Sequence, residues 1–147
     1  MKESPEIESM DEPITTNNNF EIMLVDDDEN TIEVFSEYLE LIGHNVVGKA
    51  FDGKQAFELY KTLTPDFVFM DVMMPEYDGF YGLEKIKSYD ENAVVIAVTA
   101  DLTNETEQKL KKLKSDAIIY KPFDMESIIT IMEKIHKRKQ SSKNSSM

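Results

Sequence analysis

Cysteine is absent from the 147 residues of this chain. Its absence excludes a disulfide framework, a thiol nucleophile, an iron–sulfur cluster and a cysteine-based zinc site, and it fits a reducing, cytoplasmic location. Arginine occurs only at position 138, so bidentate guanidinium recognition is almost unavailable to the protein. No apolar run approaches the roughly 18 residues of a transmembrane helix, and the acidic N-terminus lacks the apolar stretch of a secretory signal.

Positive charge is also scarce. The chain has 29 acidic and 16 basic residues, for a net charge of −13. Residues 1–108 carry 25 of the acids and 6 of the bases, whereas residues 109–147 carry 4 acids and 10 bases. A chain this acidic is a poor candidate for binding polyanions, so we expect neither nucleic acid nor a membrane surface as a partner.

The two ends of the chain differ in composition from its middle. Residues 1–19 are acidic and hold few apolar residues, which predicts a disordered leader. Residues 139–147 are polar without an apolar face, which predicts a flexible tail. We therefore expect one domain over residues 20–138, a size that can bury a core of its own.

Short apolar runs alternate with amphipathic stretches along this middle region. The runs expected as strands are 20–25, 45–50, 67–70, 93–98 and 118–120. The stretches expected as helices are 31–42, 54–63, 81–88, 104–113 and 125–135. The alternation predicts an α/β fold, a five-stranded parallel sheet with five helices on both faces. Ligands of such sheets bind beyond the carboxyl ends of the strands.

Acidic side chains and one lysine stand at these expected strand ends. The residues placed there are Asp26, Asp27, Asp28, Asp71, Thr99 and Lys121. Two carboxylates about 5 Å apart repel by roughly 3 kcal/mol at an effective dielectric near 20, so positive charge is needed among them. Mg²⁺ binds through such oxygen ligands, and a lysine and a hydroxyl can contact a phosphoryl group. The pattern predicts a site for a metal and a phosphoryl group together.

Four segments at these positions resemble the receiver domains of two-component response regulators. They are Ile22–Asp28, Phe69–Gly79, Val98–Ala100 and Tyr120–Phe123. The resemblance covers about residues 20–138 and implies the flavodoxin-like strand order 2-1-3-4-5, for which a chemotaxis member of this family is the standard example. It also implies a histidine kinase or histidine phosphotransfer protein as phosphodonor and a downstream protein as target, within two-component signalling or a phosphorelay.

The resemblance gives the acidic residues separate roles. Asp71 corresponds to the aspartate that accepts the phosphoryl group. Asp26 and Asp27 correspond to the acid pair that binds Mg²⁺, and Met73 to the position whose backbone carbonyl also coordinates the metal. Met73 and Asp101 also stand where the family places the side chains that flank the approach of water to the phosphoryl group. Because a methionine thioether cannot position water by a good hydrogen bond, we expect self-dephosphorylation to be slower than in chemotaxis-type receivers.

The resemblance also identifies the residues of the switch. Lys121 corresponds to the lysine that contacts the acyl phosphate, and Thr99 to the hydroxyl that moves toward the phosphoryl group. Pro122 corresponds to the proline after that lysine, which often follows a cis peptide bond. Ile118 stands where the family commonly has an aromatic rotamer switch, so we expect activation without an aromatic flip.

We interpret the chain as a stand-alone receiver, whose output would be a protein contact or onward phosphotransfer. Three other hypotheses remain open. A phosphatase of the haloacid-dehalogenase type shares the nucleophilic aspartate and Mg²⁺, but it needs a second aspartate where this chain has Met73. A degenerate receiver would be a constitutive interaction module, which the intact Asp71 and Lys121 argue against. The chain could also be a receiver cut from a longer protein.

Overall fold

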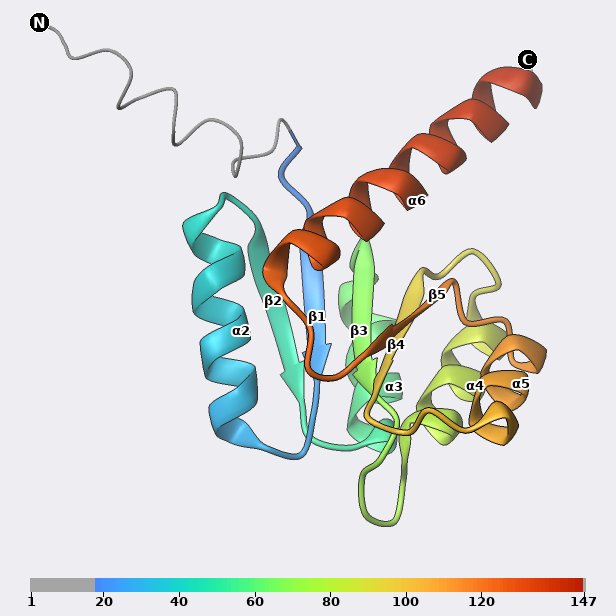
Figure 1. Ribbon diagram of the computed structural model, residues 1–147. Coiled ribbons are helices and arrows are strands. Elements are labelled where there is room, and N and C mark those ends of the chain that lie inside the picture. The colour runs from blue at the N-terminus through green and yellow to red at the C-terminus, as the bar shows by residue number, and fades with distance from the viewer. Residues whose placement is uncertain (1–17, 147) are drawn as a thin grey trace, which may run out of the picture.

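The computed structural model describes residues 18–146, with side chains described through residue 141. Most of the predicted leader, residues 1–17, therefore lies outside the described residues. The strands are β1 (Glu21–Val25), β2 (Asn45–Ala50), β3 (Phe67–Asp71), β4 (Val95–Thr99) and β5 (Ala117–Tyr120). The helices are α2 (Glu29–Leu41), α3 (Gly53–Leu63), α4 (Gly79–Tyr89), α5 (Asn104–Lys112) and α6 (Met125–Ser146). Figure 1 shows strands and helices alternating along the chain.

The five strands form one parallel sheet in the order β2-β1-β3-β4-β5. Helices α2 and α6 pack on one face of the sheet, and α3, α4 and α5 pack on the other (Figure 1). The fold class and the strand order predicted from the sequence are therefore confirmed.

The central strands are apolar throughout because both of their faces are covered. Every residue of β3 and β4 is buried. Successive side chains of β1 go to opposite layers, so Ile22 and Leu24 pack with α2 and α6 while Met23 and Val25 pack with α3 and α4. A continuous apolar run is what a doubly covered strand requires.

Four helices begin shortly after strands, at polar caps. The cap side chains of Asp28, Asp52, Asp78 and Thr103 each accept a hydrogen bond from a backbone N–H in the first turn of the helix that follows. These caps hold each helix start near the carboxyl edge of the sheet, which keeps the polar side chains of that edge in fixed positions.

The last helix is longer than the sequence predicts. α6 continues to Ser146, whereas a flexible tail was expected over residues 139–147. No glycine or proline follows Pro122, and lysine, arginine and glutamine are good helix formers, so nothing in the sequence ends the helix. Residues 137–141 are exposed, in agreement with their polar composition. Within residues 18–146, no helix combines the length and apolar character that crossing a bilayer requires.

Neither histidine has ligand partners at metal spacing in the sequence, which predicts a surface position for both. For His44 this prediction is wrong, because its side chain is buried beneath Phe20. The backbone N–H of Phe20 donates to Nδ1 of His44 at 3.1 Å, and burial lowers the pKa of the ring. His136 is half-buried and packs edge-on against the same phenylalanine. Ring packing, which spacing alone does not reveal, places both.

Candidate functional site

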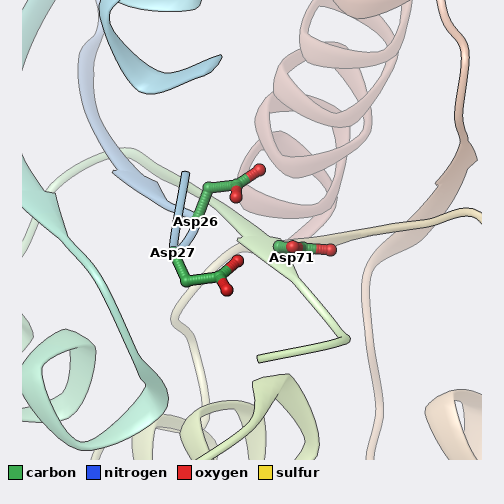
Figure 2. A group of neighbouring side chains, drawn as sticks. All are labelled: Asp26, Asp27 and Asp71. Atoms are coloured by element: carbon green, nitrogen blue, oxygen red, sulfur yellow. The ribbon is translucent and has the colours of Figure 1, made fainter. Parts of the chain in front are cut away.

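Three carboxylates meet at the carboxyl edge of the sheet. Figure 2 shows Asp26 and Asp27, just beyond β1, with their side chains directed toward Asp71 at the end of β3. One carboxylate oxygen from each residue lies within 4.8 Å of the others. β1 and β3 are neighbours, with Val25 paired to Met70, so the next residue on each strand faces the same space. Asp26 and Asp71 are buried and Asp27 is exposed, so the cluster is open to solvent on one side.

Asp28, the third acid of the sequence triplet, has a different task. Its carboxylate accepts hydrogen bonds from the backbone of Asn30 and the hydroxyl of Thr31, so it caps α2. Its own backbone N–H donates to Oδ1 of Asp26 at 2.9 Å. The triplet therefore divides into two acids of the cluster and one residue that holds the helix start and orients Asp26.

Lys121 places a positive charge beside this cluster. Its Nζ lies 3.3 Å from Oδ2 of Asp26 and 3.6 Å from Oδ1 of Asp71. A backbone hydrogen bond fixes its position, because the N–H of Lys121 donates to the carbonyl of Thr99 at 2.8 Å. The peptide bond between Lys121 and Pro122 is cis. The lysine that the sequence places at a strand end thus faces both acids from the carboxyl end of β5.

The carboxyl of Asp71 is held in an unfavourable environment for negative charge. Burial raises its pKa to about 6, and repulsion from Asp26 acts in the same direction. Lys121 and a hydrogen bond with the backbone of Met73 partly offset this increase in the pKa. Three carboxylates beside one ammonium leave an excess of negative charge, and the atoms that these carboxylates offer as metal ligands are hard oxygens. The residues present therefore fit a Mg²⁺ ion.

Thr99 ends the strand next to Asp71. The register pairs Asp71 with Val98, so Thr99 lies one residue beyond the position opposite the aspartate. Its side chain is fully buried, and its Oγ1 accepts a hydrogen bond from the backbone N–H of Asp101 at 3.0 Å. Met73, in the loop after β3, is 60% exposed. The Thr99 hydroxyl is therefore buried at the carboxyl edge of the sheet, while the Met73 thioether lies at the surface.

A glycine fixes the loop that follows Asp71. Gly79 begins α4 so close to the end of β3 that an added Cβ would lie 2.6 Å from Cα of Val72 and would also meet the carbonyl of Asp71. The N–H of Gly79 donates to the carbonyl of Val72 at 2.9 Å. Only glycine allows this approach. The loop between Asp71 and α4 is consequently a closed, well-held turn.

Asp101 makes its side-chain hydrogen bonds with two threonines at the start of α5. Its Oδ1 accepts from the backbone N–H of Thr103 at 2.9 Å, and its Oδ2 accepts from the hydroxyl of Thr106 at 2.6 Å. The sequence analysis missed both threonines, although an aspartate followed by threonines two and five residues later is a spacing that permits such bonds. Ile118 is half-buried and packs on the α3–α5 side of the sheet.

The chain matches the family described as "Response regulator receiver domain" over residues 22–133. It belongs to this family of receiver domains. Among curated relatives, a Chemotaxis protein CheY from Thermotoga maritima is 30% identical over 118 residues, which is 79% of this chain and 97% of the relative. The CheY of Halobacterium salinarum is 35% identical over 109 residues, which is 74% of this chain and 90% of the relative.

Solved receiver structures share the fold of this chain. The receiver domain of Francisella response regulator 1452 is 30% identical, with a TM-score of 0.75 over 82% of this chain and 99% of that one. The CheX-CheY-BeF3-Mg+2 complex from Borrelia burgdorferi contains a chain that is 27% identical, with a TM-score of 0.75 over 80% of this chain and 89% of that one. This receiver is thus homologous to the chemotaxis regulator CheY.

Proposed function

We propose that this receiver domain is a phosphorylation-dependent switch that accepts a phosphoryl group on Asp71 in the presence of Mg²⁺. The donor is the phosphohistidine of a histidine kinase or of a histidine phosphotransfer protein. The observation that carries the proposal is the meeting of Asp26, Asp27 and Asp71 within 4.8 Å, with the Lys121 ammonium beside them. Such a cluster is costly for a merely structural role, because like charges repel at this separation.

The proposed transfer uses the side chains at the edge of the sheet. A carboxylate oxygen of Asp71 bonds to phosphorus while the phosphorus–nitrogen bond of the donor breaks, and the histidine nitrogen keeps the electron pair. A pKa of about 6 leaves the Asp71 carboxyl mostly ionised at pH 7, as a nucleophile requires. Lys121, 3.6 Å from that carboxylate, would pair with a phosphoryl oxygen. The buried Thr99 hydroxyl would donate to another.

The proposed Mg²⁺ ligands are the carboxylates of Asp26, Asp27 and Asp71 and the backbone carbonyl of Met73. The ion would supply positive charge to the phosphoryl oxygens. A phosphatase of the haloacid-dehalogenase type would need a proton donor two residues after Asp71, where the Met73 thioether has no proton to give. The acceptor role therefore fits this chain better.

Output by protein contact or by onward phosphotransfer is equally compatible with the site. Receivers occur alone and within longer proteins, since this chain covers 97% of the Thermotoga maritima CheY but 24% of the Regulatory protein AtoC of Escherichia coli.

We propose that residues 20–138 suffice for phosphorylation in the cytoplasm, and that residues 1–19 and 139–147 can be removed. A 20–138 protein that folds and accepts phosphate as the full chain does would support these boundaries, and failure to do so would refute them.

Intact-mass measurement after incubation with acetyl phosphate and Mg²⁺ tests the acceptor. We expect one phosphoryl group on the wild type and none on Asp71→Asn, which keeps the shape but lacks the nucleophilic carboxylate. Persistent labelling of the variant would refute the assignment of Asp71.

Two neighbouring acids provide a matched test of the metal site. Asp27→Asn and Asp28→Asn each remove one negative charge, but the Asp28 carboxylate caps α2 and asparagine caps helices equally well. We expect Mg²⁺ affinity, measured by titration, to fall about tenfold or more in Asp27→Asn and to change less than about threefold in Asp28→Asn. Equal losses would mean that only overall charge attracts the ion.

A further inference from the structure

Asp101 connects the end of β4 to the start of α5 through three hydrogen bonds. Its backbone N–H donates to Oγ1 of Thr99 at 3.0 Å. Its carboxylate accepts from the backbone of Thr103 at 2.9 Å and from the hydroxyl of Thr106 at 2.6 Å. Asp101 thus contacts the buried hydroxyl of Thr99, the N-cap residue of α5 and one residue of the first turn of α5.

The helix that Asp101 holds has few other attachments. Every residue of α5 is described, and Leu110 is the one that it buries. The rest of the helix is mostly charged, and Lys109 lies over the ring of Phe80 at 4.2 Å. A helix with so little buried surface can move at small cost, so the bonds at its first turn largely set its position.

Both oxygens of the Asp101 carboxylate are already engaged. Hydrogen bonds, first from Thr106 and then from Thr103, lower the pKa of this carboxyl, so it is an ionised acceptor at neutral pH. The 2.6 Å hydroxyl–carboxylate distance is typical of a charge-assisted bond. A carboxylate occupied in this way is directed to α5 and not to a water molecule approaching Asp71.

We propose that Asp101 is the positioning residue that couples the Thr99 hydroxyl to α5, an inference that rests on the proposed phosphorylation of Asp71. In the structure described here, Oγ1 of Thr99 accepts from the Asp101 N–H. When that hydroxyl turns to donate to a phosphoryl group, this bond is altered and the Asp101 backbone shifts. The carboxylate then carries the first turn of α5 with it.

Ile118, three residues before Lys121, offers no alternative route through an aromatic side chain. Ile118 has no ring whose rotation could report the movement of Thr99 to the surface, and it packs against the α3–α5 side of the core. The Asp101 bonds form a continuous path from the hydroxyl to a loosely anchored helix. The movement is therefore carried by the loop itself.

Hydrogen exchange of the full chain, with and without beryllofluoride and Mg²⁺, tests the coupling. The informative variants are Thr106→Val, which removes the hydroxyl, and Thr106→Ser, which retains it. Thr103→Ala is the matched control. It removes the side chain that caps the same helix turn, but it keeps the backbone N–H that donates a hydrogen bond to the Asp101 carboxylate. Acetyl phosphate labelling is measured on every variant in parallel.

We expect beryllofluoride to change exchange over residues 101–112 of the wild type. Thr106→Val should lose more than half of this response while labelling normally, and Thr106→Ser should recover it. Thr103→Ala should exchange faster throughout yet keep its response to the ligand. This pattern separates coupling from simple weakening of the helix.

Other results would overturn the proposal. A Thr106→Val protein whose exchange responds to beryllofluoride like that of the wild type would show that the bond between the Asp101 carboxylate and the Thr106 hydroxyl does not transmit the change to α5. Equal loss in Thr106→Val and Thr103→Ala would show that only helix stability matters. A wild type that labels on Asp71 but shows no change in α5 would refute the coupling alone, whereas a wild type that does not label would refute the proposed function as well.

Discussion

Helices α4 and α5 lie on the same face of the sheet, and each follows a strand that ends in a site residue, Asp71 or Thr99. Their attachment differs greatly. α4 buries Gly79, Gly82, Leu83 and Ile86, whereas α5 buries Leu110. The helix after the acceptor is thus part of the scaffold, and the helix after the hydroxyl is only lightly attached to it.

Polar contacts reinforce this difference. Nζ of Lys87, near the end of α4, lies 2.8 Å from a carboxylate oxygen of Asp116 and donates to the carbonyl of Ala93 at 2.6 Å. These partly buried bonds join α4 to the starts of β4 and β5. The polar contacts of α5 lie mainly at its first turn, around Asp101. A rigid acceptor beside a movable reporter is the arrangement that a switch requires.

The largest effect should come from the start of α4. Gly79→Ala places a Cβ against the backbone of Asp71 and Val72, neither of which can yield, so we expect the free energy of unfolding to fall by about 3 kcal/mol. Asn104→Ala, at the exposed start of α5, should change it by less than about 0.5 kcal/mol. Urea unfolding of both variants checks this, and equal costs would abolish the contrast between the helices.

Removing the buried charge should stabilise the metal-free protein. The folded pKa of Asp71 is about 6 and the unfolded value about 3.9, so the folded state holds this proton more tightly. Ionisation therefore destabilises the fold progressively from about pH 4 to pH 6, and fully above it. In EDTA at pH 7 to 8, Asp71→Asn should unfold with about 1–3 kcal/mol more free energy than the wild type.

The gain from Asp71→Asn should be mostly lost near pH 4 and absent by about pH 3, where both states of the wild type are largely protonated at this site. Asp101→Asn is the control of opposite sign, because hydrogen bonds lower the pKa of that carboxyl and its loss should destabilise the protein. Denaturation curves across this pH range check both. A gain that persists unchanged at pH 4 would mean that charge is not its cause.

Native-state hydrogen exchange compares the two helices directly. We expect amides of α5 to exchange at least about tenfold faster than those around Leu83 and Ile86 in α4, because a helix with little buried surface opens locally. Lys87→Gln removes the ion pair that ties α4 to Asp116 and should narrow this gap. Equal protection in the wild type would show that α5 is held by contacts other than burial.

The smallest effect concerns the two residues that flank the acceptor. On the proposed function, Met73→Asn should speed hydrolysis of the phosphorylated protein by about three- to tenfold, because an amide can orient water and a thioether cannot. Met73→Leu should leave the rate unchanged. Asp101→Asn should change it little, since that carboxylate is bound to α5. Phosphate release in Mg²⁺ buffer measures all three, and a Met73→Asn rate at or below that of the wild type would contradict the prediction.

The sequence predicts the fold well because the signals are local. Apolar runs ending in Asp26, Asp71, Thr99 and Lys121 identify four strand ends, and parallel pairing brings such ends to one edge. The convergence of the acids follows from that rule, although the distances between them do not.

Other features depend on contacts that no local pattern contains. His44 is buried because the ring of Phe20, from a segment distant in the sequence, stacks on it. Asp28 does not join the acid cluster because its carboxylate is hydrogen-bonded to Asn30 and Thr31. The carboxylate of Asp101 could cap a helix or face the acceptor, and only the three-dimensional path of the loop decides between them. Polarity alone also fails to show where α6 ends.

The extended α6 places a group of positive charges at the opposite end of the strands from the acidic cluster. Its exposed Lys137, Arg138 and Lys139 lie toward the amino ends of the strands, where Lys139 reaches the carbonyl of Asn92, whereas the acidic cluster lies at the opposite edge (Figure 1). These two groups of charge contribute one component of an electric dipole along the strands. In the field of a charged partner, this component favours an approach with the acidic edge toward positive potential. Salt weakens this orienting effect, since the Debye length is about 8 Å at physiological ionic strength.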